Sequence, residues 1–230
     1  MILSLIPSVL SLPECTAVSK ISCGESKCGA IMTDGTVQAW VGYIGYIVPT
    51  LTNATDISCG GSVCVVIKDD NSVAGWGISF QPVYNAVDVS CGRKTCIALQ
   101  DEGTAVILSG VTYDAPTLTN VNGISCGGNA CVVLDNDGNA YAWGTPGIYG
   151  GDTDNVDLTN IAKVSCGGGA CIALKNDKTV VVWGSDAYGG TAQTLTNVSK
   201  VFCGGYVCGA IMTDRTAKVW GDVNKGGNPP

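Results

Sequence analysis

The chain has 230 residues, of which 46% are hydrophobic and 13% charged, with a formal net charge of −7 and no histidine. The negative charge argues against nucleic-acid binding, which needs cationic side chains to neutralise phosphates. The missing histidine removes the commonest general base and metal ligand, so we expect no enzyme active site, no metal and no cofactor. No uncharged apolar run reaches the roughly 20 residues of a membrane helix, so we also expect no membrane insertion.

The first 13 residues, MILSLIPSVLSLP, form an apolar stretch with two prolines. The stretch lacks a basic leader region and a clear small-residue cleavage site, which favours a strand over a secretory signal peptide. Residues 2–4 resemble residues 107–109, which lie in the predicted third strand of a later repeat. We expect the segment 1–13 to be a strand that completes a blade, or one that pairs with a neighbouring subunit.

Six segments with the same internal spacing follow, at intervals of 32 to 40 residues. In each segment a second cysteine lies five residues after the first, an acidic residue eleven after it, and in five of them tryptophan seventeen after it. The cysteine pairs are Cys23 and Cys28, Cys59 and Cys64, Cys91 and Cys96, Cys126 and Cys131, Cys166 and Cys171, and Cys203 and Cys208. The whole chain, 1–230, is therefore predicted to be a single repeat domain, with repeats at about 14–50, 51–83, 84–117, 118–157, 158–194 and 195–230.

Each repeat contains three predicted strands, as in residues 55–59, residues 63–68 and a strand that ends at a tryptophan-glycine pair. Glycines follow the first strand, and Asp-Gly or a variant such as Asp34-Gly35 predicts the second turn. Three strands cannot bury both of their faces alone, so the repeats must stack. The fold class is all-β, a β-propeller of about six short blades, with an open β-solenoid of the same units as the alternative.

The repeat pattern resembles that of the regulator of chromosome condensation family, which forms β-propellers. The resemblance rests on residues 118–121 (LTNV), Cys126-Gly127, Leu134, Asp137-Gly138 and Trp143-Gly144, with counterparts in the other repeats. It covers the chain from about Cys15 to Gly221. Histidine usually follows the Cys-Gly turn in that family, and this chain has none. The resemblance implies the propeller fold and leaves the function open.

The paired cysteines have three interpretations: disulfides within or between repeats, buried free thiols, or metal ligands. Disulfides are favoured because the chain has thirteen cysteines, and so high a cysteine content is typical of proteins in oxidising compartments, where disulfides form. Zinc is disfavoured because its sites usually have a shorter cysteine spacing or contain histidine. Cys15 is the unpaired residue, and it can be free, buried or linked to another chain.

Two glycosylation sequons begin at Asn53 and Asn197 and favour an extracellular protein. The alternative is that LTNxx[ST] is repeat chemistry that creates a sequon by chance.

The linkers between repeats are the expected contact surface, because loops on a rigid scaffold carry function. They contain the tyrosines that we assign to binding loops: Tyr43, Tyr46, Tyr113, Tyr149 and Tyr188. We expect a non-enzymatic secreted binding module whose partner is a protein or glycan. The alternatives are a structural subunit that polymerises with itself through its ends and an intracellular regulator similar to nucleotide-exchange propellers.

Overall fold

The computed structural model describes residues 17–25, 27–41, 50–61, 63–77, 79–93, 95–109, 118–128, 130–144 and 152–227. These residues form six antiparallel sheets of three strands, and each sheet corresponds to one sequence repeat. We call the sheets units 1 to 6 in chain order. The predicted all-β propeller of six short blades is confirmed.

The first strands of the units end at the first cysteine of each pair. They are β1 (Val18–Cys23), β4 (Ala54–Cys59), β7 (Ala86–Cys91), β10 (Val121–Cys126), β13 (Ile161–Cys166) and β16 (Val198–Cys203). The middle strands are β2 (Lys27–Met32), β5 (Cys64–Lys68), β8 (Cys96–Gln100), β11 (Ala130–Asp135), β14 (Ala170–Lys175) and β17 (Val207–Met212). The third strands are β3 (Val37–Val41), β6 (Val73–Trp76), β9 (Ala105–Ser109), β12 (Ala140–Gly144), β15 (Val180–Gly184) and β18 (Ala217–Gly221).

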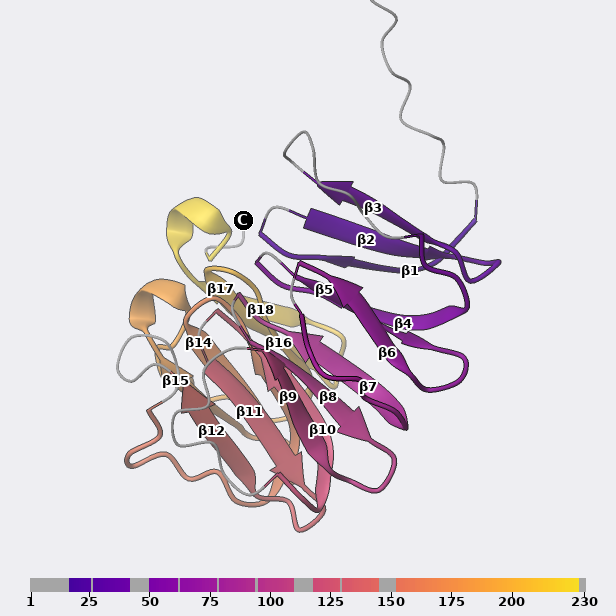
Figure 1. Ribbon diagram of the computed structural model, residues 1–230. Coiled ribbons are helices and arrows are strands. Elements are labelled where there is room, and N and C mark those ends of the chain that lie inside the picture. Colours follow the sequence, from indigo (N-terminus) through magenta and orange to yellow (C-terminus); the bar gives the residue numbers. More distant parts are fainter. Residues whose placement is uncertain are drawn as a thin grey trace, which may run out of the picture.

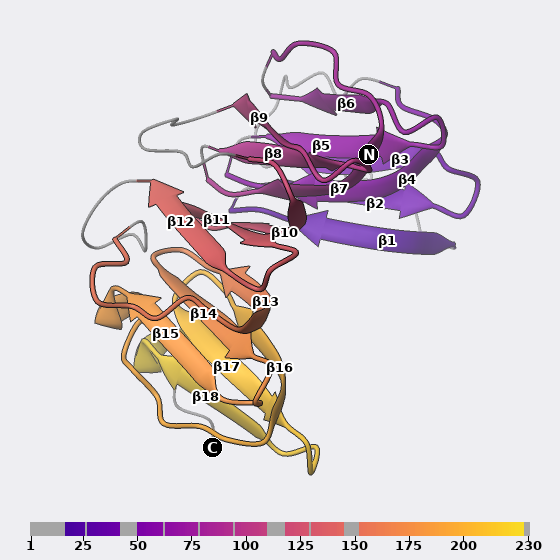
Figure 2. The same cartoon turned by 90° about the horizontal axis from the view of Figure 1, so that it is seen from below.

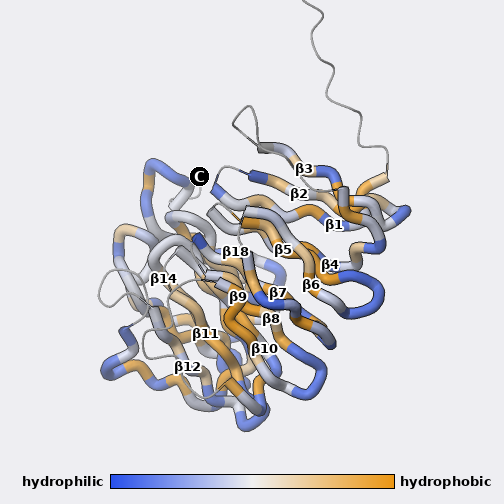
Figure 3. The backbone as a smooth tube through the Cα atoms, in the orientation of Figure 1, coloured by the Kyte–Doolittle hydropathy of each residue, from blue (hydrophilic) through white to orange (hydrophobic). Residues whose placement is uncertain are grey.

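The six sheets follow one another in an arc that begins with β1–β3 and ends with β16–β18 (Figures 1 and 2). Each sheet packs on the next through apolar side chains, as where Ile31 of unit 1 joins Ile57 and Val66 of unit 2 in one buried cluster. Apolar residues therefore concentrate along the strands and hydrophilic ones at the turns (Figure 3). The middle strand β11 is buried along its whole length, as expected of a strand covered on both faces.

The turn between the middle and third strands needs one residue in the left-handed region. Glycine meets this need at Gly35, Gly103 and Gly138, whose φ angles are 78°, 79° and 81°. The other units place Asn71, Lys178 and Arg215 there, also with positive φ. The repeated acid supports the turn: Asp34, for example, accepts a hydrogen bond from the Thr36 N–H at 2.9 Å. The predicted Asp-Gly hairpin turns are thus present and have a physical cause.

In units 2, 4, 5 and 6 a Leu-Thr-Asn (LTN) segment before the first strand connects the unit to the previous one, and Val83-Tyr84-Asn85 takes its place in unit 3. The leucine carbonyl accepts from the third strand of the preceding unit, as in the bond from the Ala140 N–H to the Leu158 carbonyl at 2.9 Å. One residue after the motif, the Ile161 N–H donates to the carbonyl of Gly138, also in the preceding unit. The asparagine between them, Asn160, has a φ of 59° that turns the chain into the new strand. These contacts between units explain why the LTN segment directly precedes the first strand in the repeats that have it.

The predicted N-terminal strand, residues 1–13, lies outside the described residues, as does Cys15. Unit 6 obtains all three of its strands from its own repeat, since β18 supplies the third. The described residues contain two single-turn 3₁₀ helices, η1 (Asp186–Tyr188) and η2 (Val223–Lys225). Within these same residues no helix has the length and apolar character needed to cross a membrane.

Candidate binding pocket at the cysteine-glycine turns

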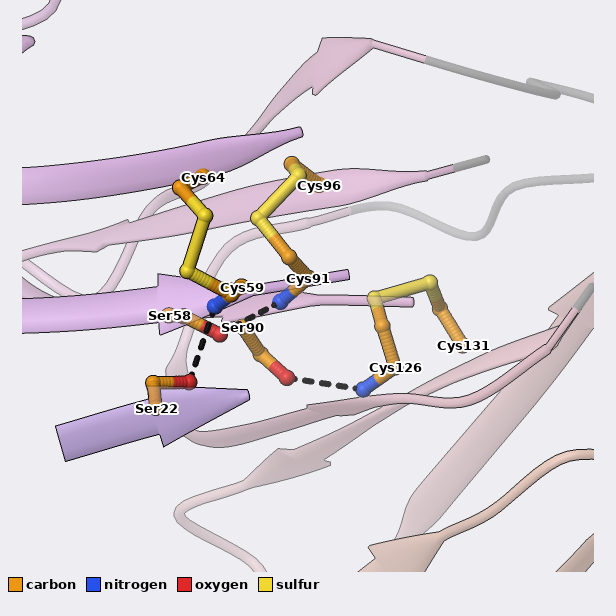
Figure 4. Close-up of a disulfide and its surroundings, with 9 residues drawn as sticks. All are labelled: Ser22, Ser58, Cys59, Cys64, Ser90, Cys91, Cys96, Cys126 and Cys131. Atoms are coloured by element: carbon orange, nitrogen blue, oxygen red, sulfur yellow. Dashed lines mark hydrogen bonds between the residues drawn. A yellow bond between two sulfur atoms is a disulfide. The ribbon is translucent and has the colours of Figure 1, made fainter. Parts of the chain in front are cut away.

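Six disulfides close the turns between first and middle strands, one in each unit. The bonds are Cys23–Cys28, Cys59–Cys64, Cys91–Cys96, Cys126–Cys131, Cys166–Cys171 and Cys203–Cys208. The two cysteines of each pair face each other across the hairpin, with Cα atoms 4.0–4.1 Å apart. Of the alternatives left open by the sequence, bonding within a unit is therefore the correct one (Figure 4).

A serine hydroxyl joins each turn to the next. The residue before the first cysteine of one unit accepts from the N–H of the first cysteine in the following unit, at 2.9–3.0 Å (Figure 4). The serines are Ser22, Ser58, Ser90, Ser125 and Ser165. Unit 6 has Phe202 in this position. We call this series the serine ladder.

The glycine after each first cysteine allows the turns to approach closely. A Cβ atom on Gly92 would lie 1.7 Å from the Gly127 carbonyl oxygen, and one on Gly127 would lie 2.0 Å from that of Gly167. Backbone hydrogen bonds follow the same path, since the Gly128 N–H donates to the Gly167 carbonyl at 2.8 Å. Side chains at these positions would force the units apart. The turns of all six units therefore meet around one shallow hollow of about 300 Å³.

A pocket of about 520 Å³ lies at this end of the propeller, and we call it the turn pocket. Its lining residues are Glu25, Arg93, Gly128, Gly168, Tyr188, Gly205 and Tyr206. The arc of sheets thus brings residues of units 1, 3, 4, 5 and 6 to a single site.

Three of the lining side chains depart from the repeat pattern. The second residue after the first cysteine is glycine in four units, and it is Glu25 in unit 1 and Arg93 in unit 3. The third residue is aromatic in unit 6 alone, as Tyr206. Because the other units show that the turn folds without these side chains, their presence together in one pocket points to recognition rather than folding.

The turn pocket combines an aromatic pair with an ion pair. The Tyr188 and Tyr206 rings stack with centroids 5.1 Å apart and an interplanar angle of 14°. Lys225 Nζ lies over the Tyr206 ring, 5.6 Å from its centroid. On the other side of the pocket, Arg93 Nε is 3.4 Å from Glu25 Oε2. Both charged side chains are more than half exposed, so they can contact a ligand from solvent.

A larger hollow of about 650 Å³ includes Asp88, Asp135, Gly138 and Lys163. Burial, followed by repulsion from Asp56, raises the pKa of the Asp88 carboxyl above its ordinary value. Hairpin-turn residues, whose counterparts occur in every unit, supply much of the lining. Among the described residues, no group of three or more histidine, cysteine, aspartate or glutamate side chains is arranged to hold a metal ion. This hollow therefore carries less unit-specific chemistry than the turn pocket.

Of the tyrosines assigned to binding loops, Tyr188 lies in the turn pocket. Tyr43, Tyr46, Tyr113 and Tyr149 lie outside the described residues.

Tyr206, Glu25 and Arg93 are not among the residues predicted to bind, because they lie in the cysteine-glycine turns, whose expected role is purely structural, and not in the linkers. The departure of these three residues from the repeat was the available signal.

Both sequon asparagines are exposed and have left-handed backbone conformations, with φ of 61° at Asn53 and 59° at Asn197. Asn85, Asn120 and Asn160 have the same conformation without being part of a sequon. The turn before the first strand therefore explains the asparagine itself, and glycosylation of the two sites stays a prediction.

The chain is similar to a known repeat family and to several solved structures. A family model described as the regulator of chromosome condensation (RCC1) repeat matches residues 161–189. Yeast RCC1 (Prp20), solved bound to Kap60, superposes with a TM-score of 0.64 and 14% identity over 89% of this chain and 70% of that one. Residues 161–189 thus match the RCC1 repeat, and the chain as a whole has the β-propeller fold. The expected resemblance is thereby confirmed.

Two other structures are similar to this RCC1-like chain. Human WBSCR16 gives a TM-score of 0.66 at 17% identity, covering 89% of this chain and 76% of that one. The CRINKLY ectodomain of the Arabidopsis thaliana receptor kinase ACR4 gives 0.64 at 15% identity, covering 89% and 79%. At such identities the likeness establishes the fold alone. A comparison with curated proteins finds no match.

Proposed function

We propose that this RCC1-like propeller is a non-enzymatic extracellular binding module that recognises its partner at the turn pocket. The observation that carries the proposal is the meeting of Glu25, Arg93 and Tyr206, three departures from the repeat, at one site. The six disulfides of the cysteine-glycine turns support the extracellular assignment, because such bonds persist in oxidising compartments. They also hold the turns in place, which lowers the entropy lost on binding.

Similar structures support both parts of the proposal. Yeast RCC1, which contains this fold, has been solved in complex with the protein Kap60. The ACR4 structure is the ectodomain of a receptor kinase, so the fold also occurs outside the cell. The intracellular regulator considered from the sequence is disfavoured, because its compartment would keep the six cysteine pairs reduced.

A photo-crosslinking experiment tests the proposed surface. A photoreactive phenylalanine analogue is placed at Tyr206, or as a matched control at Tyr84, which is 61% exposed and lies at the opposite end of β7 from the turn. The oxidised proteins are irradiated in the culture medium of the cells that produce the native protein. We expect a discrete adduct from position 206 and none from position 84.

Competition decides whether the adduct is specific. The competitor is a variant that restores the repeat pattern, Glu25→Gly, Arg93→Gly and Tyr206→Ser, compared with the unlabelled native protein. The native protein should suppress the adduct and the restored variant should not. Suppression by both proteins, or labelling from both positions, would exclude the turn pocket as the binding surface.

Assembly through the ends is a second candidate function, favoured by the exposed end faces of the arc. Val18 and Ile21 of β1 are 40% and 61% exposed, whereas Ile57, the counterpart of Ile21, is buried against unit 1. At the other end, the one described residue that a Cβ atom on Gly204 would contact is Val207 of its own unit, at 3.8 Å. Each end thus presents the surface that another unit covers elsewhere in the chain.

Phe202 disfavours this second function. In unit 1, Gly29 makes room for Ile57 of the next unit, with 2.5 Å between a hypothetical Cβ and Ile57 Cδ1. In unit 6, a Cβ atom on the equivalent Gly209 would lie 2.4 Å from Phe202 Cζ, so the Phe202 ring fills that space from within the same unit. A Phe202→Ser variant should therefore associate more strongly in sedimentation velocity than the native protein. Filaments of native protein in electron micrographs would instead establish assembly as the function.

A further inference from the structure

The aromatic part of the turn pocket is held in a defined orientation. Tyr188 packs against the turn of unit 5, where a Cβ atom on Gly168 would lie 3.2 Å from Tyr188 Cδ1. Tyr206 stacks on the same ring and stays 43% exposed. The side chain over Tyr206 is that of Lys225, which is itself exposed and can move into solvent. Tyr206 therefore offers a stiff apolar surface whose position a ligand does not have to organise.

The polar part of the pocket is balanced in charge. Glu25 brings a carboxylate that accepts hydrogen bonds, and Arg93 brings a guanidinium that donates them. Arg93 Nε lies 3.4 Å from Glu25 Oε2, so the electric fields of the two charges largely cancel at longer distances. Such a pair suits a ligand that carries both donors and acceptors and has no net charge. A phosphate or sulfate would be repelled by Glu25, and a strongly cationic group would be repelled by Arg93.

The backbone at the rim adds a further polar edge. In units 4 and 5 the Gly128 and Gly168 N–H groups donate to the carbonyl of the next turn. Gly205 is the equivalent residue of unit 6, and among the described residues nothing lies within 4 Å of a Cβ atom placed there. Gly205 lines the pocket, so its peptide groups are at the pocket wall. A volume of about 520 Å³ is within the range of small-ligand sites.

We propose that the turn pocket binds a neutral saccharide, as one or two pyranose rings at the end of a glycan. The apolar face of one sugar ring stacks on Tyr206 after Lys225 moves aside. Its hydroxyl groups donate to Glu25 and accept from Arg93, and the Gly205 peptide lies within reach of the second ring. This inference rests on the proposed function, since it names the chemical class that the binding module recognises.

The test is a titration of the oxidised protein with neutral disaccharides, followed by ligand-observed NMR. Cellobiose, lactose and diacetylchitobiose are the probes, and glucuronic acid and inorganic sulfate are the charged comparisons. We expect saturable binding of a neutral disaccharide that is the same at low and high salt, because no net charge is screened. Tyr206→Ala should weaken binding about three- to tenfold, and Tyr206→Phe should retain most of it. Arg93→Ala should also weaken binding.

Tyr84→Ala serves as the matched control and should leave the affinity unchanged. The proposal is overturned if no neutral disaccharide binds, if Tyr206→Ala binds as tightly as the native protein, or if only the charged probes bind with a strong salt dependence. The two proposals fail separately. A specific protein adduct from position 206 without saccharide binding rejects the saccharide and retains the binding module, whereas the absence of both rejects both.

Discussion

The close approach of the cysteine-glycine turns makes a sharp prediction about alanine substitution at one repeated position. In Gly92→Ala the new Cβ would lie 1.7 Å from the Gly127 carbonyl oxygen, and in Gly127→Ala it would lie 2.0 Å from the Gly167 oxygen. An ordinary contact needs at least 3.4 Å, so adjacent units must separate by more than 1 Å. This movement also lengthens the Gly128 N–H hydrogen bond at 2.8 Å.

Overpacking of this kind costs about 1–3 kcal/mol, and a weakened backbone hydrogen bond adds about 1 kcal/mol. We therefore expect Gly127→Ala to lower the free energy of unfolding by about 3 kcal/mol, or the melting temperature by roughly 6–12 °C in a chain of this size. Gly204→Ala is the matched control, because its Cβ would come no closer than 3.8 Å to any described residue, Val207 being the nearest. Its stability should be within about 0.5 kcal/mol of the native value.

Urea denaturation of the oxidised proteins, followed by tryptophan fluorescence, measures the difference. A Gly204→Ala variant as unstable as Gly127→Ala would contradict this prediction, since it would mean that another turn packs on Gly204 and that unit 6 is not an end. A stable Gly127→Ala variant would mean that the units do not approach as closely as described.

Three further predictions concern single groups. Removing one disulfide by Cys91→Ala together with Cys96→Ala should cost about 2 kcal/mol in urea denaturation, from the loop-closure entropy of so short a loop; an unchanged midpoint would contradict this. Because burial raises the pKa of Asp88, its ionisation destabilises the fold as pH rises through that pKa. Asp88→Asn should therefore stabilise the protein at neutral pH and have less effect in acid, as measured by urea denaturation at the two pH values, and a loss of stability at neutral pH would contradict the sign. The hydrogen bond from Lys175 lowers the pKa of Asp157 to about 2, so NMR titration of Lys175→Ala should find that pKa moved toward its ordinary value.

The fold was predictable because the positions of strands and turns recur at the same spacing in every repeat. Cysteine, glycine, the hairpin acid and tryptophan recur at fixed spacing, and each has a local cause such as the positive φ at Gly35. The sequence could not decide whether disulfides join the strands of one unit or neighbouring units, because both arrangements satisfy the same spacing. That choice depends on the hairpin register, which pairs Cys59 with Cys64 across two adjacent strands.

The candidate site was only partly predictable. Tyr188 could be selected from the sequence because it lies in a linker, where exposed aromatic residues attract attention. Glu25, Arg93 and Tyr206 belong to turns that are far apart in the chain, and their proximity depends on the curvature of the arc. Curvature follows from the packing angle between sheets, which no single repeat contains. A comparison of the repeats for unusual residues would have identified all three without giving their location.

The placement of the disulfides explains how function and stability are divided in this repeat protein. Bonds between units would have closed longer loops and stabilised the chain more. The units are instead held together by the buried apolar clusters between sheets. The serine ladder, the close approach of the glycines and the LTN contacts add to these clusters at the ends of the strands, and they are made by backbone groups or small side chains. Each disulfide fixes the hairpin end that presents those groups, so the turns keep one geometry while their outward side chains vary. A surface built in this way can change its ligand through Glu25, Arg93 or Tyr206 without changing the contacts that hold the propeller together.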